Sequence, residues 1–138
     1  MEIYRTKIPK LHGTNGSELY RHARTAYKEV ASKTKRRPYV RSLYFKKEKV
    51  FIDYFWGHLD GKNWNDRLRR LRFYGCALDL IRNSKKHPEL APTKDSAKRS
   101  ENLYRFFGET KDGERFAVQI KEDIKRDEKY FISVFPLP

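Results

Sequence analysis

The chain has 138 residues, with 32 Lys and Arg against 18 Asp and Glu, which gives a formal net charge of +14 at pH 7. This length is typical of one compact domain, and 9 Phe, 9 Tyr and 2 Trp supply the apolar area that a disordered chain lacks. No stretch approaches the roughly 20 apolar residues that span a bilayer, and the lone cysteine, Cys76, excludes an internal disulfide and a thiolate zinc cluster.

The first half of the chain predicts a helix followed by a hairpin. Apolar residues recur at three- and four-residue steps over residues 17–32, and Pro38 follows a basic stretch that suits a helix C-terminus. Residues 39–45 and 50–56 are rich in aromatic and β-branched side chains, and the charged turn 46–49 separates them. We expect two paired β-strands there.

The second half predicts a long helix, a loop and a meander. Residues 63–82 carry an apolar stripe that begins at Trp64 and includes Leu68, Leu71 and Leu78. Residues 83–99 are polar and contain two prolines, which indicates a surface loop. Three strands are expected over residues 102–109, 115–121 and 130–135, with Asp112-Gly113 as a hairpin turn.

Together these elements predict one basic α+β domain over residues 1–138, in which an antiparallel sheet, a hairpin plus a three-stranded meander, packs against two main helices. The first residues do not resemble a signal peptide, so we expect a cytoplasmic protein. The large positive charge favours a nucleic acid as the partner. Because aromatic residues within a basic surface can stack on unpaired bases, RNA is favoured over DNA.

The densest group of polar residues spans residues 58–72, between a predicted strand and a predicted helix. Arg67 and Arg70 lie one helical turn apart beside the apolar stripe, where guanidinium groups can grip phosphate. Arg69 and Arg72 are expected to point further into solvent. The alternative is that these arginines only keep the helix soluble.

His58 is the candidate for proton transfer, because a neutral imidazole can take a proton from a ribose 2′-hydroxyl and return one to a leaving oxygen. A lone histidine in a turn is more often structural. A metal site formed by Asp53, His58 and Asp60 ranks lower, because their spacing matches no ligand motif and the surrounding charge is positive. We therefore expect no metal and no cofactor.

The meander offers a polar strip and two aromatic residues that can stack on bases. Strand alternation allows Arg105, Gln119, Lys121 and Ser133 to lie across one face of the sheet, although the register is open. Tyr104 and Tyr130 are the aromatic candidates for base stacking. Cys76 lies in an apolar run and is expected to be a small buried hydrophobe.

The C-terminal half resembles one known superfamily. The segments Tyr104-Arg105-Phe106-Phe107-Gly108, Asp112-Gly113 and Phe116-Ala117-Val118-Gln119-Ile120-Lys121, with the closing Tyr-Phe-Ile-Ser-Val-Phe-Pro, resemble the superfamily of barnase, EndoU, colicin and RelE-like nucleases. The likeness is to its phage and mobile-element members and covers residues 50–136.

This resemblance implies metal-independent RNA cleavage, by a toxin or an effector of a mobile element. It implies His58 as base or acid, Lys62, Arg67 and Arg70 as phosphate clamps, and Lys121 or Ser133 as support from the sheet. The nucleic-acid contacts would then extend to Arg69, Arg72, Tyr104, Arg105 and Tyr130.

Two other functions fit the same residues. A nucleic-acid-binding module without activity needs only the charge and the aromatic residues. A basic inhibitor could bind an acidic protein or a ribonucleoprotein through the same surface, or a partner protein could neutralise the chain.

Overall fold

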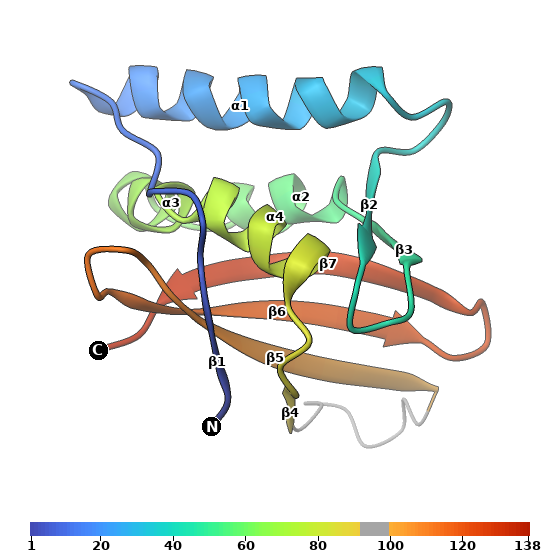
Figure 1. The fold of residues 1–138 in the computed structure, drawn as a ribbon. Helices are drawn as coiled ribbons and strands as arrows, with labels where there is room; N and C mark the ends of the chain where they lie inside the picture. Colours follow the sequence, from blue (N-terminus) through green and yellow to red (C-terminus); the bar gives the residue numbers. More distant parts are fainter. Residues whose placement is uncertain (92–99) are drawn as a thin grey trace.

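The computed structural model describes residues 1–91 and 100–138, which form four helices and seven strands. The strands make one mixed sheet in the order β1-β5-β6-β7-β3-β2, with β4 paired to β5. The sheet is strongly curled into a half-barrel, and the helices cover one of its faces (Figure 1). The fold is thus α+β, as predicted, but the sheet is not purely antiparallel.

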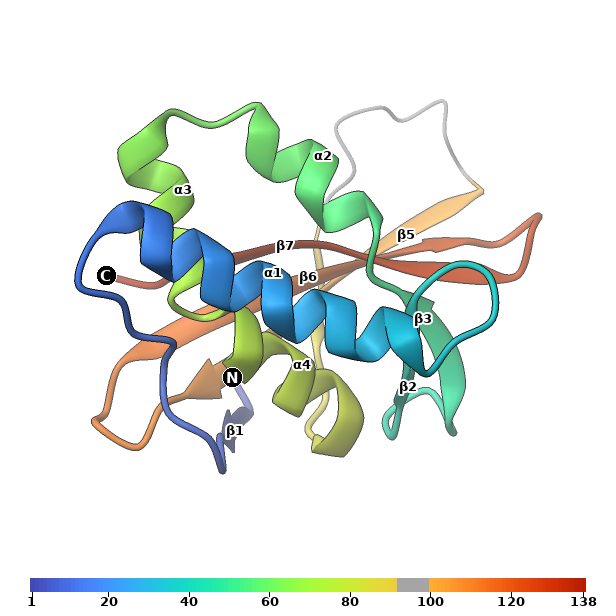
Figure 2. The same cartoon turned by 90° about the horizontal axis from the view of Figure 1, so that it is seen from above.

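Helix α1 (Gly16–Ser32) is the outermost layer, and it follows the prediction for residues 17–32. Asn15 caps its first turn by accepting a hydrogen bond from the Glu18 amide at 2.9 Å. Its buried residues, Leu19, Ala23 and Val30, face the inner helices. Seen from above, α1 crosses over α4 and the sheet, while α2 lies to one side of it (Figure 2).

The predicted hairpin forms, but its second strand is shorter than expected. β2 (Tyr39–Ser42) and β3 (Glu48–Phe51) pair antiparallel, and the chain then turns into helix α2 (Tyr54–Asp60). The prediction of a strand over residues 50–56 was therefore wrong beyond Phe51. Phe55, Trp56 and Leu59 are all buried, which is the spacing of a helix and not of a strand.

The predicted helix over residues 63–82 is two helices. α3 (Trp64–Leu71) has Arg72 as its C-cap, and α4 (Tyr74–Asn83) has Phe73 as its N-cap. The break is held by the carbonyl of Arg72, which accepts a 2.8 Å hydrogen bond from the Leu11 amide. Every α4 residue from Tyr74 to Ile81 is buried, so this helix fills the core between α1 and the sheet.

The C-terminal meander matches the prediction closely. β5 (Glu101–Glu109), β6 (Arg115–Asp123) and β7 (Glu128–Pro136) pair antiparallel in sequence. Phe116, Val118 and Ile120 are fully buried on the face toward the helices. Gly108 lies under the ring of Phe116, where a side chain would clash.

Three pairings were not predicted. β1 (Ile3–Arg5) pairs parallel with β5, β3 pairs parallel with β7, and β4 (Glu89–Ala91) lies within the predicted loop over residues 83–99. Residues 84–88 form no helix or strand, as expected for that loop, and residues 92–99 lie outside the described residues. Within the described parts of the chain, every helix is too short or too polar to span a bilayer.

Candidate functional site

The candidate site is a pocket at the outer edge of β7. β3 pairs with Lys129 and Tyr130 only, so no described strand pairs with the outer edge of β7 beyond them, and α2 and α3 contact β7 there. The pocket has a volume of about 330 Å³. The helical side contributes Phe55, His58, Leu59, Lys62 and Arg70, and the sheet contributes Gln119, Ile132, Ser133 and Phe135. We call it the His58 pocket.

A β-bulge shapes the sheet side of this pocket. Ile120 pairs with Phe131 and Gln119 pairs with Ser133, so Ile132 is an extra residue on β7. Such a bulge bends the strand and changes the direction of its side chains. Here it allows Ile132 and Ser133 to line the same pocket.

His58 is held at the rim of the pocket by the packing of α2. Phe55, one turn earlier on that helix, is buried and its ring stacks on Phe131 with 4.9 Å between centroids. The His58 side chain itself is exposed. Partial desolvation, followed by the charges of Lys121 and Lys62, lowers the pKa of His58 below its usual range. The imidazole is therefore neutral at pH 7, the form that accepts a proton.

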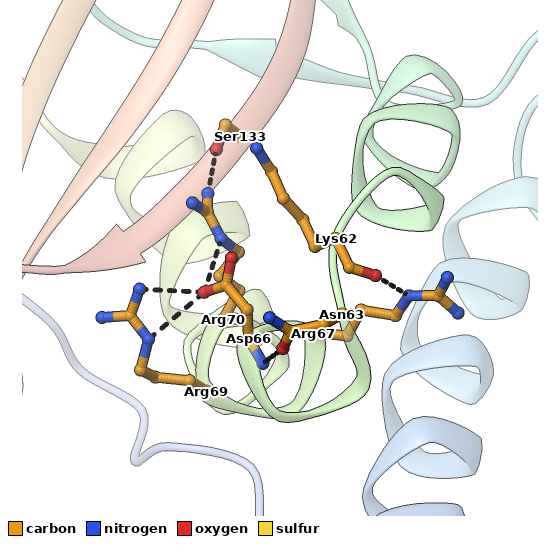
Figure 3. Close-up of polar contacts among 7 residues, drawn as sticks. All are labelled: Lys62, Asn63, Asp66, Arg67, Arg69, Arg70 and Ser133. Carbon is orange, nitrogen blue, oxygen red and sulfur yellow. Dashed lines mark hydrogen bonds and ion pairs between the residues drawn. The ribbon is translucent and has the colours of Figure 1, made fainter.

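Arg70 reaches the pocket between two fixed partners (Figure 3). Its Nε donates to Asp66 Oδ1 at 3.2 Å, and its Nη1 donates to the Ser133 hydroxyl at 2.8 Å. Its guanidinium also lies 5.5 Å from the centroid of the Phe135 ring. These contacts join α3 to β7 and fix the direction of the guanidinium.

Lys62 and Arg67 lie on different sides of the turn before α3. Figure 3 shows the Lys62 side chain extending toward Ser133, whereas Arg67 extends away from Arg70. Arg67 donates to the main-chain carbonyls of Lys62 and Asp60 at 2.8 and 2.7 Å. Arg67 therefore stabilises the turn and does not line the pocket. We had expected Arg67 and Arg70 to grip phosphate together.

The predicted polar strip has a definite register. Arg105 pairs with Gln119 on β6, and Gln119 pairs with Ser133 on β7, so these three residues form one row across the sheet. The Arg105 guanidinium lies 6.0 Å from the Phe135 centroid, on the ring that Arg70 also contacts. The row thus ends at the His58 pocket.

Lys121, the fourth member of the predicted strip, lines an adjoining pocket of about 240 Å³. We call this the Lys121 pocket, and its lining residues are Tyr54, His58, Lys121, Asp123, Arg126, Tyr130 and Ile132. His58 and Ile132 line both pockets, so the two lie side by side. Lys121 also forms a 3.3 Å ion pair with Glu101.

The remaining predicted nucleic-acid contacts lie in several environments. Arg69 pairs with Asp66 at 2.8 Å, and Arg72 is exposed at the break between α3 and α4. The Tyr104 hydroxyl donates to Glu122 at 3.0 Å; burial, followed by this carboxylate, raises the pKa of Tyr104 to about 12. Tyr130 is buried, with its ring 4.7 Å from that of Tyr54.

The electrostatics of the His58 pocket favour an anion. Of the described residues, no Asp or Glu lines it, and Lys62 forms no ion pair with a described side chain. Across residues 1–91 and 100–138, no group of three or more His, Cys, Asp or Glu gathers as a metal site would require. Cys76 is buried on α4, and desolvation raises the pKa of its thiol to about 11.

Sequence reasoning missed two contributors to the pocket. Asp66, which had no predicted role, orients Arg70 from four residues earlier on the same helix. That i,i+4 spacing is visible in the sequence. Phe135 was assigned to a strand without a role, and only the bulged register of β7 brings it under the two arginines.

Comparison with known proteins adds no assignment: no family model, no curated protein and no solved structure matches this chain.

Proposed function

We propose that this chain is an endoribonuclease that cleaves RNA through the ribose 2′-hydroxyl without a metal, with the His58 pocket as its centre. One observation supports this most: an imidazole with a lowered pKa shares an acid-free pocket with Lys62 and Arg70. The resemblance of the meander to the barnase, EndoU, colicin and RelE-like nucleases supports the same chemistry and a role as a toxin or mobile-element effector.

The chemistry requires a base, cations and a proton donor. Neutral His58 would take the proton of the 2′-hydroxyl, and the oxygen would then form a bond to phosphorus. Arg70, fixed by Asp66 and Ser133, would hold the negative phosphate oxygens as charge develops on them. The bond from phosphorus to the 5′-oxygen would break, and that oxygen would take its proton from Lys62. The products would be a 2′,3′-cyclic phosphate and a 5′-hydroxyl.

The test is cleavage of single-stranded RNA by the purified protein in excess EDTA between pH 5 and 9. His58→Ala should lower kcat/KM by about 10²- to 10⁴-fold, the usual contribution of a general base. The matched control is His12→Ala, because His12 is exposed and does not line the pocket. Intact RNA with the wild-type protein at every pH would reject the proposal.

A second candidate is a nucleic-acid-binding module without activity. One observation favours it: His58 is the only imidazole of the described residues that lines the pocket, so no second imidazole is available as the acid. In that case the protein would bind RNA in a salt-dependent way and leave it uncut.

A further inference from the structure

We propose that single-stranded RNA reaches the His58 pocket along a track that begins at the basic junction between α1 and the β2–β3 hairpin. This inference rests on the proposed function and adds to it the form of the substrate and its path. The track consists of three hollows: a pocket at that junction, which we call the Arg36 pocket, the Lys121 pocket and the His58 pocket.

The Arg36 pocket is the largest of the three, at about 620 Å³. Its basic lining residues are Lys33, Lys35, Arg36, Arg37 and Lys49. Lys35 and Arg36 are exposed and form no ion pair with a described side chain. They are therefore available for phosphate.

The acidic groups along the track are already bound to cations. Glu128, which lines the Arg36 pocket, accepts from Arg37 at 3.5 Å, and Asp53 pairs with the same guanidinium at 3.0 Å. Asp123, in the Lys121 pocket, lies 3.9 Å from Arg126. A polyanion that follows the track would thus meet few unpaired carboxylates.

Arg37 and three aromatic rings connect the Arg36 pocket to the Lys121 pocket. The guanidinium of Arg37 lies 4.3 Å from the centroid of Phe51, 5.2 Å from that of Tyr54 and 5.5 Å from that of Tyr130. Phe51 lines the first pocket, whereas Tyr54 and Tyr130 line the second. The Lys121 pocket then shares His58 with the catalytic one.

The alternation of rings and cations suits an unpaired strand. Tyr54 is 47 % exposed and can present its ring to a base, while Lys121 and Arg126, which line the same pocket, would contact the phosphates of the strand. A duplex keeps its bases stacked on each other and offers no free face to such a ring. Ser133 and Glu128 are five residues apart on β7, about 16 Å at 3.3 Å per residue, which allows contact with several nucleotides.

The test measures binding of labelled 2′-O-methyl oligonucleotides, which lack the reactive hydroxyl, by fluorescence anisotropy. The double variant Lys35→Gln/Arg36→Gln should lower the affinity for an oligonucleotide of about twelve nucleotides roughly tenfold. Its affinity for a dinucleotide should be unchanged. The salt slope of log K should fall by about 1.4, because each lost phosphate contact removes about 0.7 on a single strand. Tyr54→Ala should weaken the longer strand to a similar degree.

The matched control is Lys85→Gln/Lys86→Gln, an adjacent and exposed basic pair that lines none of the three pockets. Equal affinities of the two double variants for the longer strand would overturn the track, even if the wild type cleaves RNA. A selective loss in the Lys35/Arg36 variant would support the track, even if the wild type leaves RNA intact. Binding of the wild type to duplex and single strand with equal affinity would also overturn it.

Discussion

The charges of two lysines act on His58, and this gives the site a measurable acid–base property. Partial desolvation, then the charge of Lys121, then that of Lys62 disfavour the protonated ring, so the pKa of His58 is below its usual range. A base with a lowered pKa stays deprotonated, and therefore active, at a lower pH than a free histidine does. The rate of cleavage should thus rise with pH and reach its plateau at a lower pH than it would with a histidine of ordinary pKa.

The lysine effect is testable without any substrate. Lys121→Gln removes one positive charge near the ring, so the pKa of His58 should rise toward the value of a free histidine. The measurement is an NMR titration of the His58 ring protons, with Lys111→Gln as a control, because Lys111 lies in the turn between β5 and β6. An unchanged midpoint in the Lys121 variant would contradict the electrostatic account.

Asp66 should matter for stability as well as for orientation. Asp66→Asn weakens the ion pairs with both Arg69 and Arg70, and it removes a negative charge from the first turn of α3. Because Asp66 is only partly buried, we expect a loss of about 1 kcal/mol in the free energy of unfolding. Asp60→Asn, which removes a charge from an exposed side chain, should have little effect in the same urea titration.

Among the elements, those with one clear periodicity were predictable, and those decided by tertiary contacts were not. The three-four spacing of α1 and the turn signal between β5 and β6 belong to the local sequence. In α2, the aromatic composition favoured a strand, but the burial of Phe55, Trp56 and Leu59 on one side required a helix. The break between α3 and α4 depends on the hydrogen bond from the Leu11 amide to the Arg72 carbonyl. These residues are 61 positions apart, so no local sequence pattern predicts the contact.

The parallel strand pairings also could not be predicted from the local sequence. β1 has only three residues, too few for a periodic pattern, and its place beside β5 is fixed by contacts with α4. Asp79 on α4 accepts hydrogen bonds from the Tyr4 hydroxyl at 3.1 Å and from the Lys7 amide at 2.9 Å. These two contacts hold the N-terminal strand against the core helix.

Removing Asp79 should therefore destabilise the fold strongly. Asp79→Ala leaves the Tyr4 hydroxyl and the Lys7 amide without their partner, and we expect a loss of about 2–4 kcal/mol. Tyr4→Phe removes only one donor and should cost about 1 kcal/mol. Chemical denaturation measures both, and equal losses would mean that the hydrogen bonds from the Lys7 amide and the Asn83 side chain to Asp79 contribute nothing.

Gly108 tests how tightly the meander packs. A methyl group at this position would lie 2.3 Å from Cζ of Phe116, a ring that is fully buried. Gly108→Ala should lower the free energy of unfolding by about 1–3 kcal/mol, the usual effect of overpacking. Gly57→Ala on α2 is the control, since nothing lies within 4 Å of the added methyl and alanine favours helix. An unchanged stability in Gly108→Ala would show that β5 and β6 can separate without strain.

For the whole molecule, the sequence predicted the residues of the candidate site better than their arrangement. His58, Arg70 and Ser133, named from residue type and spacing, line one pocket together with Lys62, which was named only from the superfamily resemblance. Their convergence depends on the bulge at Ile132 and on the unpaired edge of β7, neither of which local sequence specifies. Arg67 does not line the pocket, because its guanidinium donates instead to two main-chain carbonyls of the preceding turn.

The positive charge is not confined to this pocket. Exposed lysines also occur at the β2–β3 turn, after α4 and in the turns of the meander. Such charges add to long-range attraction for a polyanion without choosing a site on the surface. The proposed cleavage therefore depends on the local chemistry at His58 more than on the net charge.

The most direct measurement uses an oligonucleotide with one ribose in an otherwise 2′-deoxy strand, incubated with the wild-type protein in excess EDTA. The proposed mechanism predicts a single cut, on the 3′ side of that ribose, which leaves a 2′,3′-cyclic phosphate, and no cut in the strand without ribose. Cuts at deoxy positions, or no cut in a strand that the protein binds, would contradict it.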